Sequence, residues 1–183
     1  MTIDPRRLTG LEIMQAIAAG HLPGAPIAEV MNFTGIRTVE HGRVVFAAIA
    51  QRSHYNPIGT VHGGWAATLL DSCMGCAVHS ALPAGKAYTT LSLEIKYVKA
   101  LTEATGEVLA EGRVIQLGSR QATAEGWLRG PDGTLYAHGT TTCLVFGIDR
   151  LGWRSNRRIC ACRWLTQRSS FHLSNRAWRK LRT

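Results

Sequence analysis

The sequence predicts an α+β fold in which an antiparallel sheet of about five or six strands wraps around one long central helix. The first observation behind this prediction is that residues 65–80 are apolar or small on nearly every side, as in a buried helix. The second is that stretches with the alternation of β-strands lie on both sides of this run. A chain of 183 residues is long enough for one domain with a sizeable core and too short for two full ones.

Residues 1–26 are expected to form an N-terminal helix and a linker. Thr9 and Glu12 have the spacing of a capping box, and apolar residues follow them at helical intervals. From residue 27 to residue 51 the chain favours strands, with a turn signal at residues 40–42. This pattern predicts a β-hairpin.

Three further strands are predicted after the central helix. The stretch 88–98 alternates between apolar and polar residues, which is the period of a strand with one buried face. Its apolar positions are Leu91, Leu93, Ile95 and Tyr97. Strands at 104–117 and 120–129 lie on either side of a Gly-Ser turn, and a strand at 134–146 follows a Pro-Asp-Gly turn. The domain is therefore expected to span residues 27–148.

Residues 149–183 differ from the rest of the chain in charge. They hold 10 Lys and Arg against one acid, which accounts for the whole net charge of +9, whereas residues 1–148 hold 11 basic and 11 acidic side chains. Because no apolar periodicity accompanies this charge, a disordered basic tail is expected. Its arginines and its three tryptophans are of the kind that contacts phosphates and stacks on bases. A nucleic-acid partner is nevertheless not expected, because no recognised binding module is present.

Several features indicate a cytoplasmic protein. No apolar run reaches the roughly 20 residues that a membrane-spanning helix needs. Glu12 and Gln15 interrupt the apolar stretch that a signal peptide would require. The 5 cysteines are an odd number and do not have the spacing of a secreted disulfide framework.

Two cysteines, Cys73 and Cys76, have a Cys-x-x-Cys spacing. Because they lie inside the apolar helix and outside a βαβ unit, we interpret them as small buried hydrophobic residues. A zinc site that combines them with Cys160 and Cys162 lacks a usual ligand spacing. We expect neither a metal ion nor another cofactor.

Asp71 is the only acidic residue between Gly63 and Val78. Because burying an unpaired carboxylate is costly, such a group either is held by nearby hydroxyl groups or has a chemical task. Gly63 and Gly64 lie where the helix is predicted to begin, and the free N–H groups there favour a developing negative charge. This glycine pair is either an oxyanion hole for acyl transfer or only a joint between loop and helix.

The spacing of these residues has a consequence for assembly. Eight residues along a helix correspond to a rise of about 12 Å. The Gly63 N–H and the Asp71 carboxylate of one chain therefore cannot readily act on the same carbonyl group. If both serve one reaction, they come from two chains, and a symmetric dimer has two such sites.

The segment Asn56-Pro-Ile-Gly-Thr-Val-His62-Gly63-Gly64, followed by Leu-Leu-Asp71, resembles the motif of the phenylacetate-degradation-type hotdog thioesterases. These enzymes hydrolyse acyl-CoA. The resemblance covers about residues 27–147, and the order of the elements is that of the hotdog fold, in which a sheet wraps around a helix.

The resemblance implies a role for each residue of the motif. In that family the Asp is the general base or nucleophile, the Gly after the His polarises the thioester carbonyl through its backbone N–H, and the Asn supports the site. These roles fall on Asp71, Gly63 and Asn56. His62 and Gly64 are then expected to bind substrate, with His62 shaping the loop by hydrogen bonding; a role of His62 as the base is the alternative.

The resemblance also implies residues beyond the motif. A Ser or Thr on the strand after the helix orients water or the acid in the family, which indicates Thr90, with Thr89 left open by the loop length. The turn that holds Ser119 and Arg120 is expected to lie near the phosphates of coenzyme A. Arg120 is suited to pair with a phosphate, and a solvated hairpin arginine is the alternative.

The resulting hypothesis is hydrolysis of an acyl-CoA thioester to a carboxylic acid and coenzyme A by a homodimer or a dimer of dimers. The acyl group is expected in a tunnel along the helix, for which the candidate lining residues are Trp65, Leu69, Met74 and His79. One alternative is a hotdog hydratase or dehydratase, for which His79 is the only matching histidine after Asp71. The other is a non-catalytic acyl-CoA or nucleic-acid binder that uses the basic tail.

Overall fold

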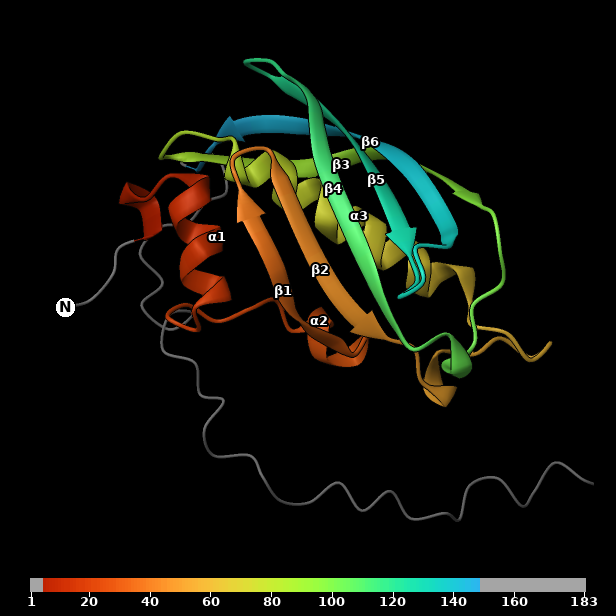
Figure 1. Ribbon diagram of the computed structural model, residues 1–183. Helices are drawn as coiled ribbons and strands as arrows, with labels where there is room; N and C mark the ends of the chain where they lie inside the picture. Colours follow the sequence, from red (N-terminus) through yellow and green to blue (C-terminus); the bar gives the residue numbers. More distant parts are fainter. Residues whose placement is uncertain (1–4, 149–183) are drawn as a thin grey trace, which may run out of the picture. The chain divides into compact units, whose positions relative to one another are not determined.

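The computed structural model describes residues 5–148, which form three α-helices, six strands and three short 3₁₀ turns (Figure 1). The helices are α1 (Gly10–Ala18), α2 (Ile27–Val30) and α3 (Gly63–Ser80). The strands are β1 (Phe33–Glu40), β2 (Arg43–Ile49), β3 (Lys86–Tyr97), β4 (Glu107–Leu117), β5 (Gln121–Arg129) and β6 (Leu135–Gly147). The 3₁₀ turns are Pro5–Arg7, Arg52–His54 and Glu103–Thr105. The predicted tail at 149–183 lies outside the described residues.

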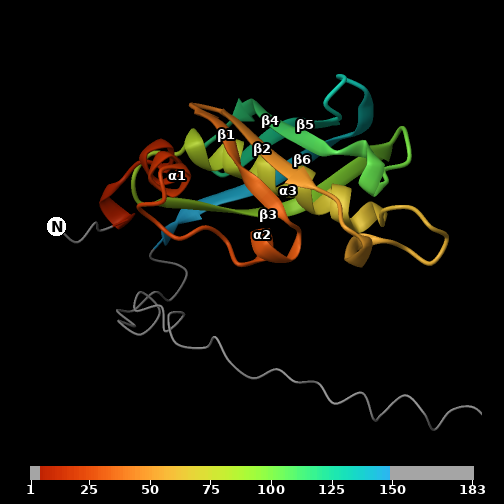
Figure 2. The same ribbon diagram turned by 60° about the horizontal axis from the view of Figure 1, so that its bottom comes forward.

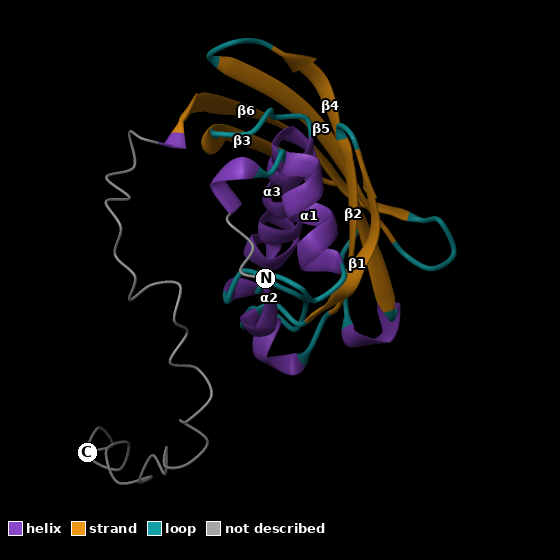
Figure 3. Cartoon of the chain, turned by 90° about the vertical axis from the view of Figure 1, so that its left-hand side faces the viewer, coloured by secondary structure: helices purple, strands orange, loops and turns teal. Residues whose placement is uncertain are grey.

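The six strands form one antiparallel sheet in the order β1-β2-β4-β5-β6-β3. The sheet curves around α3, and Figure 3 shows α3 and α1 on its inner side. The α+β prediction of a sheet wrapped around a long helix is therefore confirmed, with six strands. The turns predicted at residues 40–42, 118–119 and 131–133 each lie between two strands of this sheet.

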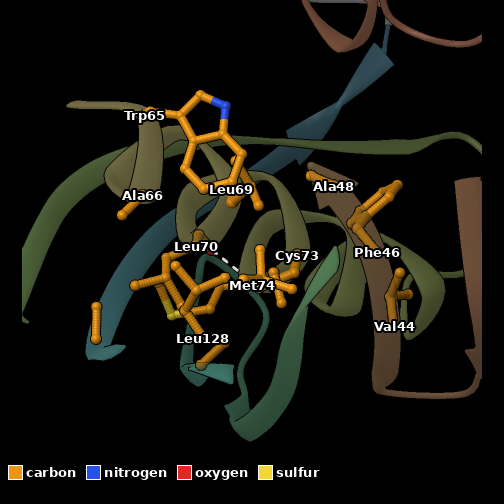
Figure 4. Packing of buried hydrophobic residues seen from close by; sticks show 14 of the residues in the cluster. Val44, Phe46, Ala48, Trp65, Ala66, Leu69, Leu70, Cys73, Met74 and Leu128 are labelled. Atoms are coloured by element: carbon orange, nitrogen blue, oxygen red, sulfur yellow. Dashed lines mark hydrogen bonds between the residues drawn. The ribbon is translucent and has the colours of Figure 1, made fainter. Parts of the chain in front are cut away.

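The core lies between α3 and the inner face of the sheet (Figure 4). Sheet and helix approach closely at Gly112 of β4, where a Cβ atom would stand 2.4 Å from the backbone of Cys73. Three of the residues proposed to line an acyl tunnel, Trp65, Leu69 and Met74, pack in this core. Within one chain they face the sheet, because a helix covered by a sheet turns its large apolar side chains toward it, and their role along an acyl tunnel stays a prediction.

The strand predicted from residue 27 is wrong over its first residues. Residues 27–30 form the short helix α2, and β1 begins only at Phe33. The backbone of Pro26 is already helical, and Asn32 then adopts a left-handed φ of 53° that ends the turn. Ile27 and Val30 are exposed, so no burial on a sheet drives them into an extended conformation.

The N-terminal helix has the predicted capping box. The Thr9 hydroxyl accepts a hydrogen bond from the Glu12 N–H, and the Glu12 carboxylate accepts one from the Thr9 N–H. The helix packs against the C-terminal end of α3, where the Gly10 N–H donates to the Leu82 carbonyl at 3.0 Å, and it adds Met14 to the core. Within the described part of the chain, no helix is both long and apolar enough to cross a membrane.

Strand β3 lies at the edge of the sheet, paired with β6 alone and running beside α3 (Figure 2). Its predicted alternation is interrupted, because the pairing with β6 slips by one residue between Thr90 and Ser92. Leu91 is the extra residue of this β-bulge and is 53% exposed, so it does not share a buried face with Ile95 as predicted. The edge position leaves most of the strand accessible to solvent.

Candidate active site

The first residues of α3 form a tightly held turn. His62 is the N-cap, and its Nδ1 accepts a hydrogen bond from the Gly64 N–H at 2.8 Å. The His62 carbonyl accepts from the Trp65 N–H at 2.9 Å, and the His62 N–H donates to the His54 carbonyl at 2.8 Å. Because Nδ1 is engaged as an acceptor, this arrangement favours the loop-shaping interpretation of His62 over the base.

Gly63 combines an open N–H with a bonded carbonyl. Among the described residues, no acceptor is paired with the Gly63 N–H, whereas the Tyr97 hydroxyl donates to the Gly63 carbonyl at 3.0 Å. Gly63 lies in the wall of a cavity of about 270 Å³ whose other walls include Val61, Leu101 and Tyr136. This is the arrangement that an oxyanion donor needs, a free N–H at a helix N-terminus beside space for a ligand.

Asn56 holds the loop that leads into α3. Its side-chain oxygen accepts hydrogen bonds from the Ile58 and Thr60 N–H groups at 3.0 and 3.3 Å, and its amide donates to the Thr60 hydroxyl at 2.9 Å. All of these partners belong to the loop itself. The structure therefore shows Asn56 as a residue that shapes the loop, which agrees with a supporting role rather than a direct chemical one.

Asp71 lies in the middle of α3 and is partly buried. The Thr90 hydroxyl on β3 donates a hydrogen bond to its Oδ1 at 2.9 Å. Thr90 is paired with the buried Cys143, so it faces α3, whereas the neighbouring Thr89 is paired with Leu144 on the other face. Of the two threonines that the sequence left open, Thr90 is the one that contacts the carboxylate.

The cysteines near Asp71 are neutral thiols. Burial raises the pKa of Cys76 to about 11, and the charge of Asp71 adds to this effect against a hydrogen bond with Tyr88 that lowers it. Burial likewise raises the pKa of Cys73, whose Sγ donates to the Leu70 carbonyl. These cysteines are free and buried or partly buried, as predicted, and they have no nucleophilic character at neutral pH.

One chain alone does not bring Asp71 and Gly63 together. Both belong to α3, with Asp71 eight residues beyond Gly63, a rise of about 12 Å. Asp71 is also absent from the walls of the cavity beside Gly63. The described chain therefore contains two half-sites, one with the glycine donor and one with the Asp71–Thr90 pair.

Ser119 and Arg120 lie on the exposed turn between β4 and β5. They line an open hollow of about 500 Å³ together with Gln116 and Thr123. Within residues 5–148, no acidic side chain pairs with Arg120, so its guanidinium is available to an anion. The turn is separate from both half-sites of the same chain.

His79 lies near the C-terminal end of α3, eight residues beyond Asp71. Its ring is tilted against that of Tyr88, with 5.7 Å between the ring centres, and burial lowers its pKa. It is thus a packed, neutral side chain two helical turns away from the carboxylate. Within the segment that the structure describes, no three metal-ligating side chains are close enough together to hold an ion.

Sequence reasoning treated Tyr97 as an ordinary strand residue, and the structure places its hydroxyl on Gly63. The two residues are 34 positions apart, and neither the motif nor the alternation of the strand contains a signal for this contact. A glycine at position 63 is consistent with it, because a Cβ atom there would stand 3.0 Å from the Tyr97 ring.

Comparison with known proteins shows a similarity to thioesterases. A model of the Thioesterase superfamily matches residues 58–137, which include α3, β3, β4 and β5. A curated protein of Halobacterium salinarum named "putative esterase" is 37% identical over 95 residues, which are 51% of this chain and 61% of that protein. The chain thus spans about three fifths of the length of this relative.

Solved thioesterase structures share the fold. The phenylacetic acid degradation-related protein of Ralstonia eutropha is 26% identical with a TM-score of 0.65, over 71% of this chain and 97% of that one. A variant of the phenylacetic acid degradation protein of Thermus thermophilus is 26% identical with a TM-score of 0.59, over 66% and 98%. A Haemophilus influenzae thioesterase, at 16% identity and a TM-score of 0.63 over 80% and 93%, shares the fold alone. The fold is therefore the hotdog fold of the thioesterase superfamily.

Proposed function

We propose that this protein hydrolyses an acyl-CoA thioester to a carboxylic acid and free coenzyme A. The observation that carries the proposal is the pair of half-sites on α3: an open Gly63 N–H beside a cavity, and an Asp71 carboxylate held by Thr90. A general base or nucleophile and an oxyanion donor are the two groups that acyl transfer requires. The match of residues 58–137 to the Thioesterase superfamily model supports thioester hydrolysis in general.

In the proposed mechanism the thioester oxygen accepts a hydrogen bond from the Gly63 N–H. The helix N-terminus favours the negative charge that develops on this oxygen as the carbonyl carbon becomes tetrahedral. Asp71 either takes a proton from the attacking water or attacks the carbon itself and forms an acyl-aspartate that water then hydrolyses. The carbon–sulfur bond breaks in both routes, and the coenzyme A thiolate leaves and is protonated.

A single turnover in ¹⁸O-labelled water tests for the second route, because only an acyl-aspartate that water attacks at the Asp71 carbon places the label in the protein. If Asp71 acts as a base, the label enters only the carboxylic acid product. If Asp71 is the nucleophile and water attacks its acylated carboxylate, the label enters the protein at Asp71.

The proposed site is shared between two copies of the chain. The separation of Gly63 and Asp71 along α3 calls for the carboxylate of a second protomer. A homodimer provides this arrangement twice, and a dimer of such dimers provides it four times. Exposed apolar side chains on the edge strand, Leu91, Leu93 and Tyr97, are consistent with a surface that a second copy covers.

The remaining parts of the proposal concern coenzyme A and location. Ser119 and Arg120 are proposed to lie near its phosphates, because the unpaired guanidinium lines an open hollow on the turn. No metal or redox cofactor takes part in the proposed reaction. The cytoplasm is the proposed location, because the described cysteines are free thiols.

Release of free thiol from a panel of acyl-CoA substrates, measured with the full chain, tests the function. Hydrolysis of at least one member at rates well above the uncatalysed reaction is expected. Tight binding of acyl-CoA without thiol release would favour a non-catalytic binder. Addition of water to an enoyl-CoA without thiol release would favour a hydratase, against which the packed position of His79 already argues.

A further inference from the structure

Gly63 and Gly64 are two consecutive glycines at the start of α3, so the direction of the proposed oxyanion donor, the Gly63 N–H, is not fixed by the glycines themselves. Glycine has more backbone freedom than any other residue, so the Gly63 N–H keeps its direction only if the neighbouring peptide groups are held. The peptide before Gly63 is held by the Trp65 N–H on the His62 carbonyl. The peptide after Gly63 is held through its N–H by the His62 ring.

Tyr97 holds the carbonyl group of Gly63. Its hydroxyl donates to the Gly63 carbonyl at 3.0 Å, so both polar groups of the peptide between Gly63 and Gly64 are engaged. The ring lies against the Gly63 Cα, where an added Cβ atom would meet it at 3.0 Å. The His62 carbonyl and the Gly64 N–H are held by residues 62–65 themselves, whereas the bond from Tyr97 comes from β3 and ties the turn to the sheet.

The bulge in β3 allows the same strand to hold Asp71. Thr90 is paired with Cys143 and Tyr97 with Ala137, two residues of β6 that face the core, so both side chains face α3. Residues seven positions apart on a regular strand point to opposite faces. The extra residue, Leu91, reverses this alternation between them.

We propose that Tyr97 is a positioning residue that fixes the Gly63 peptide groups for oxyanion binding. The proposal rests on the proposed function, since it concerns the donor of that site. One strand then orients both groups of α3 that the reaction needs, the Asp71 carboxylate through Thr90 and the Gly63 turn through Tyr97. In a shared site, these two groups serve opposite active sites of the dimer.

Tyr97→Phe tests the proposal, because it removes the hydroxyl and keeps the ring against Gly63. We expect kcat to fall about 2- to 10-fold, the factor that corresponds to the net strength of one neutral hydrogen bond, with KM changed less than about 2-fold. Because the substitution removes a single hydroxyl and keeps the ring against Gly63, the thermal midpoint should remain close to that of the wild type. An unchanged kcat in the folded variant would overturn the proposal.

Tyr88→Phe is the matched control. Tyr88 also lies on β3 and against a glycine of α3, Gly75, but its hydroxyl contacts Cys76 rather than Gly63. The kcat of this variant is expected to stay within about 2-fold of the wild type, because the lost hydrogen bond does not hold the Gly63 turn. Equal losses in both variants would show a general effect of β3 tyrosines and contradict a specific role of Tyr97.

A binding measurement without turnover separates positioning from simple packing. S-(3,3,3-trifluoro-2-oxopropyl)-CoA forms a hydrate that resembles the tetrahedral intermediate, whereas S-propyl-CoA has no oxygen for the Gly63 N–H. Tyr97→Phe should lower the affinity for the trifluoro-oxopropyl compound by the same factor by which it lowers kcat. The affinity for S-propyl-CoA should remain unchanged. Equal weakening of both would overturn the proposal. Because the ratio needs no hydrolysis, it tests Tyr97 even if the wild type releases no thiol, a result that would refute the proposed function instead.

Discussion

At the scale of single residues, the carboxylate of Asp71 is supported by one neutral donor and no cation. Its hydrogen bond from Thr90 fixes one oxygen at 2.9 Å, and among the described residues no Lys or Arg forms an ion pair with it. Among the described residues, no hydrogen bond forms to its second oxygen. In the proposed mechanism this oxygen acts on the water molecule or on the carbonyl carbon.

Replacing Asp71 with Asn should abolish most of the hydrolysis and leave the fold intact. The amide oxygen of Asn can still accept the Thr90 hydrogen bond, but the side chain is neither a base nor a nucleophile. Loss of a general base typically lowers the rate about 10²- to 10⁴-fold, and we expect kcat to fall within that range. Near wild-type thiol release by a folded Asp71→Asn variant would contradict the mechanism.

Replacing Thr90 with Val should lower kcat by about 10-fold or more, because a hydrogen bond to a charged group is lost. Thr90→Ser keeps a hydroxyl and should recover most of the activity. Thr89→Val is the matched control, since Thr89 lies on the other face of β3 and should have little effect. A larger loss for Thr89→Val than for Thr90→Val would reverse the assignment that the structure makes.

At the scale of elements, α3 and β3 together determine where the functional groups lie. The helix supplies the glycine turn, the carboxylate and the wall of the core, and the edge strand supplies the two hydroxyl groups that hold them. The bulge in β3 places Thr90 and Tyr97 on the face of the strand toward α3. The buried Thr141 of β6 supports the bulge by donating a hydrogen bond to the Ser92 carbonyl at 2.9 Å. The position of both hydroxyls therefore depends on pairing between β3 and β6.

Replacing Thr141 with Val should destabilise the bulge and impair catalysis together. The Ser92 carbonyl loses its donor, and we expect the free energy of unfolding, measured by urea denaturation, to fall by about 1 kcal/mol. Because Thr90 and Tyr97 flank the bulge, kcat should fall as well, while Thr141→Ser should be less affected. A loss of stability with unchanged kcat would show that the site does not depend on the bulge.

Only some features of the fold and of the candidate site can be predicted from the sequence alone. The central helix and three turns of the sheet were predictable, because apolar patterning and local spacing determine them. The roles of the motif residues around Gly63 and Asp71 follow from the family resemblance and stay predictions. The helix at residues 27–30 was not, because four residues carry no periodicity. The bulge and the bond from Tyr97 to Gly63 were not predictable either, since a slip in pairing depends on β6 and the contact joins residues 34 positions apart.

At the scale of the whole molecule, the proposed site requires more than one chain. The oxyanion donor and the carboxylate lie two turns apart on one rigid helix, so internal motion cannot bring them to one carbonyl group. Two chains related by a twofold axis solve this problem, because each contributes the group that the other lacks. The proposed activity is then a property of the assembly, with no complete site in a monomer.

Mixing two inactive variants should restore part of the activity if the sites are shared. Asp71→Asn supplies an intact loop, and a variant that disrupts the loop at Asn56 supplies an intact carboxylate. Each heterodimer then has one complete site, so random exchange of subunits should return about a quarter of the wild-type thiol release. Native mass spectrometry confirms exchange. No recovery after verified exchange would count against a shared site.

Removing residues 149–183 should leave both stability and hydrolysis essentially unchanged. The segment carries the whole net charge of +9 without apolar periodicity, whereas residues 1–148 are balanced in charge and contain every residue of the proposed site. A segment of high net charge without apolar periodicity is expected to contribute little packing, so its removal should cost little free energy of unfolding. The measurements are the thermal midpoint, the mass in solution and thiol release of the chain truncated after Ile148. Loss of dimerisation, or of most of the activity in a folded truncated protein, would show that these residues belong to the working structure.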